Sequence, residues 1–255
     1  MVEFYKYQGT GNDFIIIDDR AGNFDINTTK IADLCDRKFG VGADGLMLLQ
    51  KADDYDFRMV YYNADGHEST MCGNGGRCIV AFAKVLGIIK DEAFFIAVDG
   101  PHKARIEDSQ IALEMIDVDT ITSFDKDFVL NTGSPHYVKF VEDLILLDVA
   151  KEGKKIRNLS KFKSEGINVN FAEFDDGRLV VRTYERGVED ETLSCGTGVT
   201  AAAICFSAAN NQIQHIPIST LGGRLQVVLN WHEESVKNIW LKGPATFVFK
   251  GQIIQ

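Results

Sequence analysis

Short apolar runs separated by polar turns make up most of the chain, and their β-branched and aromatic residues predict β-strands. In the first half, the expected strands are 2–7, 14–19, 46–50, 57–62, 94–98, 103–107 and 111–116. In the second half, they are 128–132, 137–141, 167–174, 179–184, 216–220, 225–230, 238–241 and 246–254. The chain lacks a long alternation of strand and helix, so the pattern argues against a parallel Rossmann-type sheet.

Helical periodicity is confined to a few stretches. One helix is expected at 30–39, with Thr28 or Thr29 as its N-cap. Another short helix is expected at 156–162. The polar, acidic segment 117–127 lacks either pattern, and we interpret it as a crossover between two halves of the chain.

Two stretches share one pattern, in which a cysteine directly precedes a Gly-x-Gly turn and a small, apolar, helix-like segment follows. They are Cys72-Gly73-Asn74-Gly75-Gly76-Arg77 and Cys195-Gly196-Thr197-Gly198-Val199-Thr200. The likeness extends upstream, since Tyr62 ends a strand ten residues before Cys72 and Tyr184 ends one eleven residues before Cys195. This repeat predicts two similar domains with a pseudo-twofold relation.

The acidic crossover sets the expected domain boundaries. The N-terminal domain would comprise 1–117 plus 245–255 and carry Cys72, and the C-terminal domain would comprise 118–244 and carry Cys195. Each copy holds its thiol at the same structural position. If the copies pack through equivalent faces, we expect the two thiols to face one substrate from opposite sides.

Composition narrows the class of protein. The 255 residues are 45% hydrophobic, which suffices for one large core or two smaller ones. The net charge of −10, without a basic run, argues against a nucleic-acid or anionic-membrane partner. We expect a cytoplasmic protein, because neither a signal peptide nor an apolar run long enough to span a membrane is apparent.

The five cysteines do not suggest a disulfide framework or a structural zinc site. Their number is odd, and they form no Cys-x-x-Cys motif. We expect no metal, and we interpret Cys35, Cys78 and Cys205 as small buried hydrophobic residues.

A Gly-x-Gly-x-x-Gly pattern at 40–45 resembles a dinucleotide-binding fingerprint. That fingerprint requires a strand before it and a helix after it. Here a predicted helix precedes the glycines and a predicted strand follows them, so we interpret 40–45 as a glycine loop.

The two cysteine turns suggest their own chemistry. Backbone N–H groups at a helix N-terminus favour a thiolate and can also hold a carboxylate. Two equivalent thiols suit inversion of a stereocentre, because one removes a Cα proton while the other delivers a proton to the opposite face. Helix N-termini that bind the α-carboxylate would stabilise the carbanion. We find no convincing pyridoxal phosphate lysine and expect no cofactor.

Several blocks, taken in order, resemble the diaminopimelate epimerase family. They are Asn12-Asp13-Phe14, Asn63-Ala64-Asp65-Gly66, Cys72-Gly73-Asn74-Gly75-Gly76-Arg77-Cys78, Glu185-Arg186-Gly187 and Cys195-Gly196-Thr197-Gly198. The resemblance implies conversion of LL-2,6-diaminopimelate to the meso isomer in lysine and peptidoglycan synthesis. It also implies an α+β fold with two like domains, each wrapping antiparallel strands around a central helix, and a homodimer.

The resemblance also assigns roles by position. Cys72 and Cys195 would be the acid/base pair, and Glu185 would bind the reacting ammonium. The backbone of Gly73-Asn74 and of Gly196-Thr197 would hold the reacting carboxylate. The distal groups would be bound by Asn63, Asn168 and Arg186, with Asn12 helping. Arginine suits that task because it can bind a carboxylate in a bidentate way.

The chain departs from the family pattern at two positions. Ser134 stands in Gly133-Ser134-Pro135-His136, where many members have Asn, and Gly45 stands where some have Gln. Serine can still donate a hydrogen bond but reaches less far. His136 supports the site from behind or belongs to a turn, and the sequence leaves both open.

Three other functions fit parts of the pattern. A proline racemase would also use two cysteines, but its substrate lacks the distal charged end that the Asn and Arg set would bind. A two-cysteine redox enzyme would form a disulfide between Cys72 and Cys195. A non-catalytic amino-acid-binding protein would tolerate replacement of either cysteine.

Overall fold

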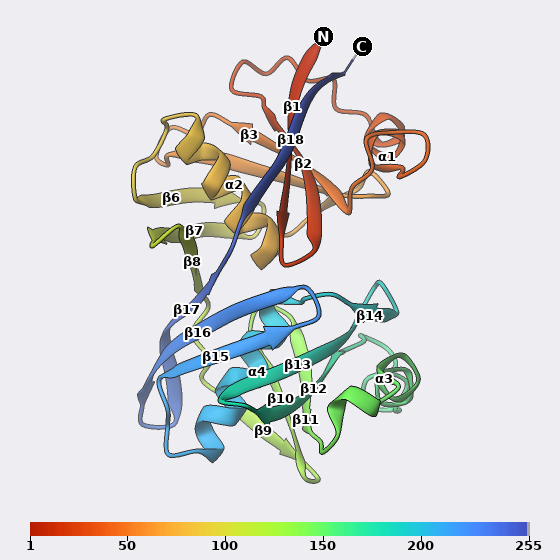
Figure 1. The fold of residues 1–255 in the computed structure, drawn as a ribbon, viewed down its shortest axis with the longest axis vertical. Helices are drawn as coiled ribbons and strands as arrows, with labels where there is room; N and C mark the ends of the chain where they lie inside the picture. The colour runs from red at the N-terminus through yellow and green to blue at the C-terminus, as the bar shows by residue number, and fades with distance from the viewer. Residues whose placement is uncertain (254–255) are drawn as a thin grey trace. The chain divides into compact units, whose positions relative to one another are not determined.

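The computed structural model describes residues 1–253, which form two compact units (Figure 1). Unit 1 comprises Met1–Leu113 and Gly243–Gln255, and unit 2 comprises Glu114–Lys242. Residues 254 and 255, which belong to the expected segment 245–255, lie outside the described part of the chain.

The described part of unit 1 contains nine strands. Eight of them pair in the order β18, β1, β2, β3, β4, β6, β7, β8, and the short β5 lies beside β4. They are β1 (Val2–Gly9), β2 (Asn12–Asp18), β3 (Gly45–Gln50), β4 (Phe57–Asn63), β5 (Glu68–Ser69), β6 (Glu92–Ala97), β7 (Gly100–Glu107), β8 (Gln110–Met115) and β18 (Thr246–Ile253). The pairs β2–β3 and β4–β6 are parallel, and the other pairs are antiparallel. The helices of this unit are α1 (Thr28–Cys35) and α2 (Gly73–Val85).

Unit 2 repeats this arrangement with strands in the order β9, β10, β11, β12, β13, β15, β16, β17, and β14 lies beside β13. They are β9 (Ile121–Phe124), β10 (Asp127–Asn131), β11 (Pro135–Phe140), β12 (Asn168–Asp175), β13 (Arg178–Glu185), β14 (Asp190–Thr192), β15 (His215–Thr220), β16 (Gly223–His232) and β17 (Ser235–Gly243). The helices are η1 (Leu144–Leu146), α3 (Val149–Arg157) and α4 (Gly196–Ala209).

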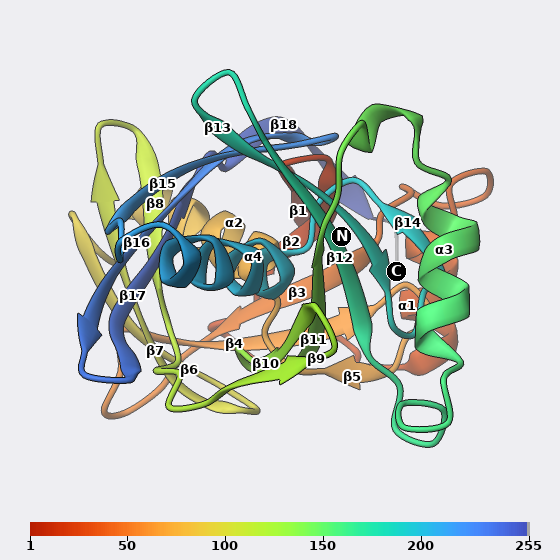
Figure 2. The same ribbon diagram turned by 90° about the horizontal axis from the view of Figure 1, so that it is seen from below.

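The two units share one topology. In unit 2 the parallel pairs are β11–β12 and β13–β15, which occupy the same places in the strand order as the parallel pairs of unit 1. In each unit the helix that follows the cysteine, α2 or α4, packs inside the curved strands (Figure 2). The predicted repeat and the predicted fold class, mainly antiparallel strands around a central helix, are therefore confirmed.

Both faces of the unit 1 sheet are covered near the first cysteine turn. Ile15 and Ile17 of β2 pack with Ile31 of α1 on one face. Phe14 and Met47 face the start of α2 on the other. Strands covered on both faces have continuous apolar runs, as β2 does. The first turn of α2 is therefore seated on a rigid surface.

The composition of α4 explains its central position. Residues 198–207 of this helix are buried on every side, and many of them are alanine or other small residues. A helix that is apolar all round is stable only when it is surrounded by other elements. Small side chains let the strands approach closely on all sides, so α4 holds Cys195 firmly at its N-terminus.

The structure differs from the expected elements at three places. The first helix ends at Cys35 rather than residue 39, and its N-cap is Asn27, whose side chain accepts from the N–H groups of residues 29 and 30. The helix expected at 156–162 is α3, which starts earlier because Asp148 caps it by accepting from the Lys151 N–H. The crossover 117–127 contains β9, which forms a hairpin with β10.

Candidate active site

The first cysteine turn forms the N-terminus of α2. Cys72 is the N-cap with φ −101° and ψ 142°, and its Sγ accepts a hydrogen bond from the Gly75 N–H at 3.2 Å. A Cβ on Gly75 would lie 3.3 Å from Met47 Sδ and 3.5 Å from Cys72 Sγ, so glycine lets the sheet approach the thiol. The sulfur therefore lies at the N-terminal end of the helix, where the N–H groups of the first turn point.

Arg77 holds this turn from inside unit 1. Its side chain is 0% exposed, and it donates to Gly73 O at 3.2 Å, to Asn74 Oδ1 at 3.0 Å and to Pro244 O at 3.2 Å. Burial lowers the pKa of Arg77 below its usual value. The guanidinium ties the glycine turn to the segment between β17 and β18.

Asn12 lies beside the first cysteine. It begins β2, and its Oδ1 accepts from Cys72 Sγ at 3.7 Å and from Asn74 Nδ2 at 3.4 Å. Asn74 is buried, and its Oδ1 also accepts from the Thr10 hydroxyl at 3.3 Å. The structure thus brings together three of the predicted site residues, Asn12, Cys72 and Asn74.

Asn63 ends β4 and pairs with Gly45 across the sheet. Its side chain is exposed, and its backbone closes a turn by donating to His67 O at 3.0 Å and accepting from the Gly66 N–H at 2.9 Å. A Cβ on Gly45 would lie only 2.5 Å from both the Tyr61 ring and the Tyr62 carbonyl oxygen. Glycine at 45 is therefore required by the packing of β4.

The second cysteine turn forms the N-terminus of α4. Cys195 is the N-cap with φ −118° and ψ 113°, it is 8% exposed, and its Sγ lies 3.5 Å from Thr197 Oγ1. The Thr132 hydroxyl donates to Thr197 O at 2.9 Å, and the Thr200 hydroxyl donates to Gly196 O at 2.9 Å. These bonds use carbonyl groups, so they leave the N–H groups of Gly196 and Thr197 for an anion.

Three other predicted site residues of unit 2 contact one another. Asn168 Nδ2 donates to Ser134 Oγ at 2.9 Å and to Pro135 O at 3.2 Å, and its Oδ1 accepts from the Arg186 N–H at 2.9 Å. Arg186 Nη2 donates to Ser134 Oγ at 3.3 Å. Glu185 ends β13 directly before Arg186. The short Ser134 side chain thus contacts both Asn168 and Arg186 through its hydroxyl oxygen.

His136 lies directly behind this cluster. It is 0% exposed, and its Nδ1 accepts from Asn170 Nδ2 at 3.1 Å, so the ring proton is on Nε2. Burial, reinforced by the charge of Arg186, lowers its pKa to about 3, and the ring is neutral. Asn170 also accepts from the Thr183 hydroxyl at 2.9 Å, and its Oδ1 lies against Gly198 of α4. His136 therefore supports the second cysteine turn through Asn170.

The remaining cysteines have different surroundings. Burial raises the pKa of Cys35 to about 11 and also raises the pKa of Cys78 and Cys205. All three are buried in the cores of their units, as expected from the sequence. Such thiols stay protonated and are poor nucleophiles.

Several residues around the site carry no assignment from the sequence, namely Thr10, Arg37, Asp44, Arg77, Thr132 and Asn170. For Asn170 a signal was available, because Asn168 and Asn170 alternate on one face of a strand where asparagine is disfavoured. The partners of Arg77 and Asp44 are far away in the sequence, so only the fold reveals them.

Residues 1–253 contain no cluster of three or more His, Cys, Asp or Glu side chains arranged to hold a metal ion. Over the same residues, every helix is too short or too polar to cross a membrane.

Comparison with known sequences gives consistent matches over the whole chain. A family model described as diaminopimelate epimerase matches residues 4–118 and 128–248. A diaminopimelate epimerase of Flavobacterium psychrophilum is 52% identical over 99% of this chain and 100% of that protein. One from Chlorobaculum tepidum is 40% identical over 96% of this chain and 98% of that protein.

Solved structures with low sequence identity share the fold. A phenazine biosynthesis protein of the PhzF family from Bacillus anthracis aligns with a TM-score of 0.78 at 13% identity, covering 100% of this chain and 99% of that one. A probable proline racemase from Agrobacterium radiobacter aligns with a TM-score of 0.70 at 14% identity, covering 100% and 93%. At such identities the likeness concerns the fold alone.

Proposed function

The chain belongs to the diaminopimelate epimerase family, and we propose that it interconverts LL-2,6-diaminopimelate and meso-2,6-diaminopimelate, a step of lysine and peptidoglycan precursor synthesis. One structural observation carries the proposal. Each unit places a cysteine as the N-cap of its central helix, followed at once by glycine. The chemistry requires two such thiols, and the chain has one in each copy of its repeat.

The proposed reaction is a proton exchange at one α-carbon. The thiolate of one cysteine removes the Cα proton and becomes a thiol, and the electron pair stays on the substrate as a carbanion conjugated with its carboxylate. The thiol of the other cysteine then donates its proton to the opposite face and becomes a thiolate. Reversal exchanges the roles of Cys72 and Cys195, so each cysteine must be able to act both as a thiolate and as a thiol.

The carbanion is the difficult intermediate, and we propose that the helix N-termini stabilise it. The N–H groups of Gly73 and Asn74 at α2, and of Gly196 and Thr197 at α4, would donate to the substrate carboxylate as negative charge builds on it. Fixed donors of this kind need no reorganisation during the reaction. No step in this scheme requires a cofactor.

We propose that the cluster of Asn168, Ser134 and Arg186 binds the distal end of the substrate. The guanidinium of Arg186 can bind the distal carboxylate, and Asn168 and Ser134 orient the guanidinium and the backbone beside it. Glu185 would meet the reacting ammonium, and Asn12 and Asn63 would help at the distal groups. His136 acts from behind, through Asn170.

Two broader proposals accompany the activity. We propose a homodimer, because β18 exposes Phe247, Val248 and Phe249, which are 48%, 52% and 44% exposed. Light scattering after gel filtration would give twice the chain mass if this is correct, and the single chain mass if it is not.

We also propose a cytoplasmic location, where the precursors of lysine and peptidoglycan are made.

The activity is tested by incubating the purified protein with LL-diaminopimelate and, separately, with L-proline, followed by chiral chromatography. Formation of meso-diaminopimelate with unchanged proline is the expected result. Cys72→Ala and Cys195→Ala should each abolish conversion, whereas Cys35→Ala should retain it because that thiol is buried in the core. Racemised proline, or turnover that survives both active-cysteine variants, would contradict the proposal.

A further inference from the structure

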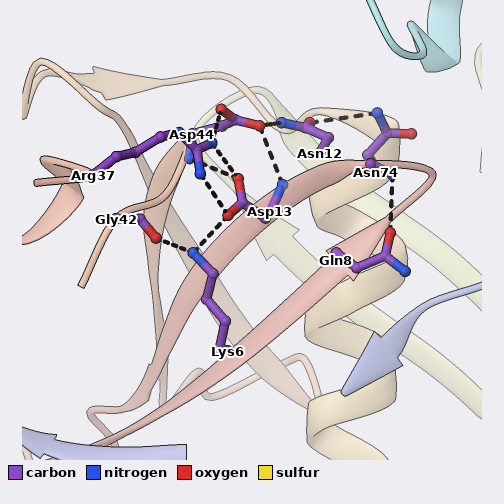
Figure 3. Close-up of polar contacts among 9 residues, drawn as sticks. Lys6, Gln8, Asn12, Asp13, Arg37, Gly42, Asp44 and Asn74 are labelled. Atoms are coloured by element: carbon purple, nitrogen blue, oxygen red, sulfur yellow. Dashed lines mark hydrogen bonds and ion pairs between the residues drawn. The ribbon is translucent and has the colours of Figure 1, made fainter. Parts of the chain in front are cut away.

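The glycine loop at 40–45 is docked against the start of β2 through Asp44 (Figure 3). The Asp44 carboxylate accepts from Asn12 Nδ2 at 2.7 Å and from the Asp13 N–H at 3.2 Å. The Asp44 N–H in turn donates to Asp13 O at 2.9 Å. The glycine loop therefore contacts Asn12, a residue beside the first cysteine.

This contact fixes which way the Asn12 amide faces. A carboxylate can only accept hydrogen bonds, so the atom of Asn12 beside Asp44 must be the NH₂ group. The amide oxygen then faces the other way, toward Cys72 Sγ at 3.7 Å and Asn74 Nδ2 at 3.4 Å. An amide turned by half a rotation would instead place an N–H donor at the sulfur.

Ion pairs with Arg37 and Lys6 hold Asp44 and Asp13 in place. Arg37 Nη2 lies 2.7 Å from Asp44 Oδ1 and 2.6 Å from Asp13 Oδ1, and Lys6 Nζ lies 2.7 Å from Asp13 Oδ2 (Figure 3). Lys6 also donates to the Gly42 carbonyl of the same loop. Burial favours the neutral form of Asp13, but hydrogen bonds from Arg37 and Lys6 outweigh it and lower its pKa to about 2.

We propose that Asp44 is a positioning residue for Cys72, because it holds Asn12 with the amide oxygen on the thiol and so keeps the proton on that sulfur. The inference rests on the proposed function, in which one thiol must be protonated while the other is a thiolate. A hydrogen bond accepted from S–H favours the protonated form. At the second turn, Cys195 instead lies beside a hydroxyl, that of Thr197, which can donate to a thiolate.

Other charged groups near Cys72 come from elements that the test leaves unchanged. Arg77 lies in the first turns of α2, and its charge interacts with the Cys72 thiol. Asp99 accepts from the N–H of Met71, the residue before Cys72. Both groups are present in every variant below, so they cancel in the comparison.

The test measures the alkylation rate of Cys72 by iodoacetamide as a function of pH, read by peptide mass spectrometry in a Cys195→Ala background. Asp44→Ala frees the Asn12 amide, and the reaction midpoint should fall by about half to one pH unit. Asp44→Asn keeps an amide oxygen for Asn12 Nδ2 and should restore the original midpoint. If the midpoint shifts equally in Asp44→Ala and Asp44→Asn, the effect comes from the lost charge and the proposal is overturned. If the midpoint shifts in neither variant, Asp44 is not coupled to Cys72 and the proposal is also overturned.

A second set of variants keeps the test decisive if Asp44→Ala does not fold. Asn12→Ala removes the acceptor and should lower the midpoint to the same extent, so an unmoved midpoint in this variant alone overturns the assignment. Adding Asp44→Ala to Asn12→Ala should cause no further shift, because Asp44 acts through Asn12.

The matched control is Asp18→Ala, which removes an ion pair with Arg20, at 2.8 and 2.7 Å, from the other end of β2. The control should leave the midpoint unchanged, and an equal shift in it would also overturn the proposal. Alkylation needs no substrate, so these results are independent of whether the protein converts diaminopimelate.

Discussion

The amide oxygen of Asn170 lies so close to Gly198 that a Cβ at residue 198 would overlap it. Asn170 is itself fixed by Tyr137 O, by the Thr183 hydroxyl and by the ring of His136. The second cysteine turn therefore rests on a buried amide that has no freedom to move away. Glycine at 198 is therefore a packing requirement of unit 2.

Replacement of Gly198 by Ala should destabilise unit 2 by about 1–3 kcal/mol, the usual range for overpacking of a rigid core. The matched variant is Gly75→Ala, at the same position of the first turn. There the added Cβ meets the flexible Met47 side chain at 3.3 Å, so the loss should be smaller. Urea unfolding of both variants checks this, and equal losses would show that Asn170 yields readily.

His136 should make stability depend on pH. Its folded-state pKa of about 3 lies far below the ordinary value of 6.5, so the unfolded chain binds a proton that the folded chain does not. Stability is then fully present above about pH 6.5 and falls as the pH drops toward 3, by up to about 1.4 kcal/mol per pH unit.

Urea unfolding at a series of pH values tests this expectation. The variant His136→Gln should flatten the stability curve below pH 6.5 relative to the unsubstituted protein. His215→Gln, at an exposed position of β15, serves as the control. A curve that stays equally steep in His136→Gln would mean that other groups cause the acid sensitivity.

Gly45 offers a test of one departure from the family pattern. Gly45→Gln should not add a useful substrate contact, because its Cβ would meet the Tyr61 ring and the Tyr62 carbonyl oxygen at 2.5 Å. We expect a loss of about 1–3 kcal/mol of stability together with lower activity. Thermal unfolding and the epimerase assay measure the two effects, and an active variant of unchanged stability would refute the packing argument.

The sequence predicts those features that depend on residues close together in the chain. Cys72 and Cys195 each stand directly before glycines and a small apolar segment, so their position as N-caps follows from neighbouring residues. The repeated strand order follows from the repeated pattern. The start of α3 was missed because its sequence is mostly polar and contains Gly153, which packs against Tyr184.

The supporting contacts could not be predicted because their partners are distant in the chain. Asp44 reaches Asn12, and Arg77 reaches the carbonyl of Pro244, only after the strands have paired. The contact of Asn170 with Gly198 likewise joins β12 to α4. Residue type and spacing indicate which side chains carry chemistry, whereas the fold determines which residues hold them in place.

The central claim is that Cys72 and Cys195 exchange protons with the two faces of one α-carbon. The most direct measurement is incubation with LL-diaminopimelate in deuterated water, with the deuterium located by mass spectrometry and proton NMR. We predict solvent deuterium at one α-carbon in the meso product, and loss of stereoinversion in both Cys72→Ala and Cys195→Ala. Meso product without deuterium, or deuterium incorporation that persists unchanged in both variants, would contradict the account.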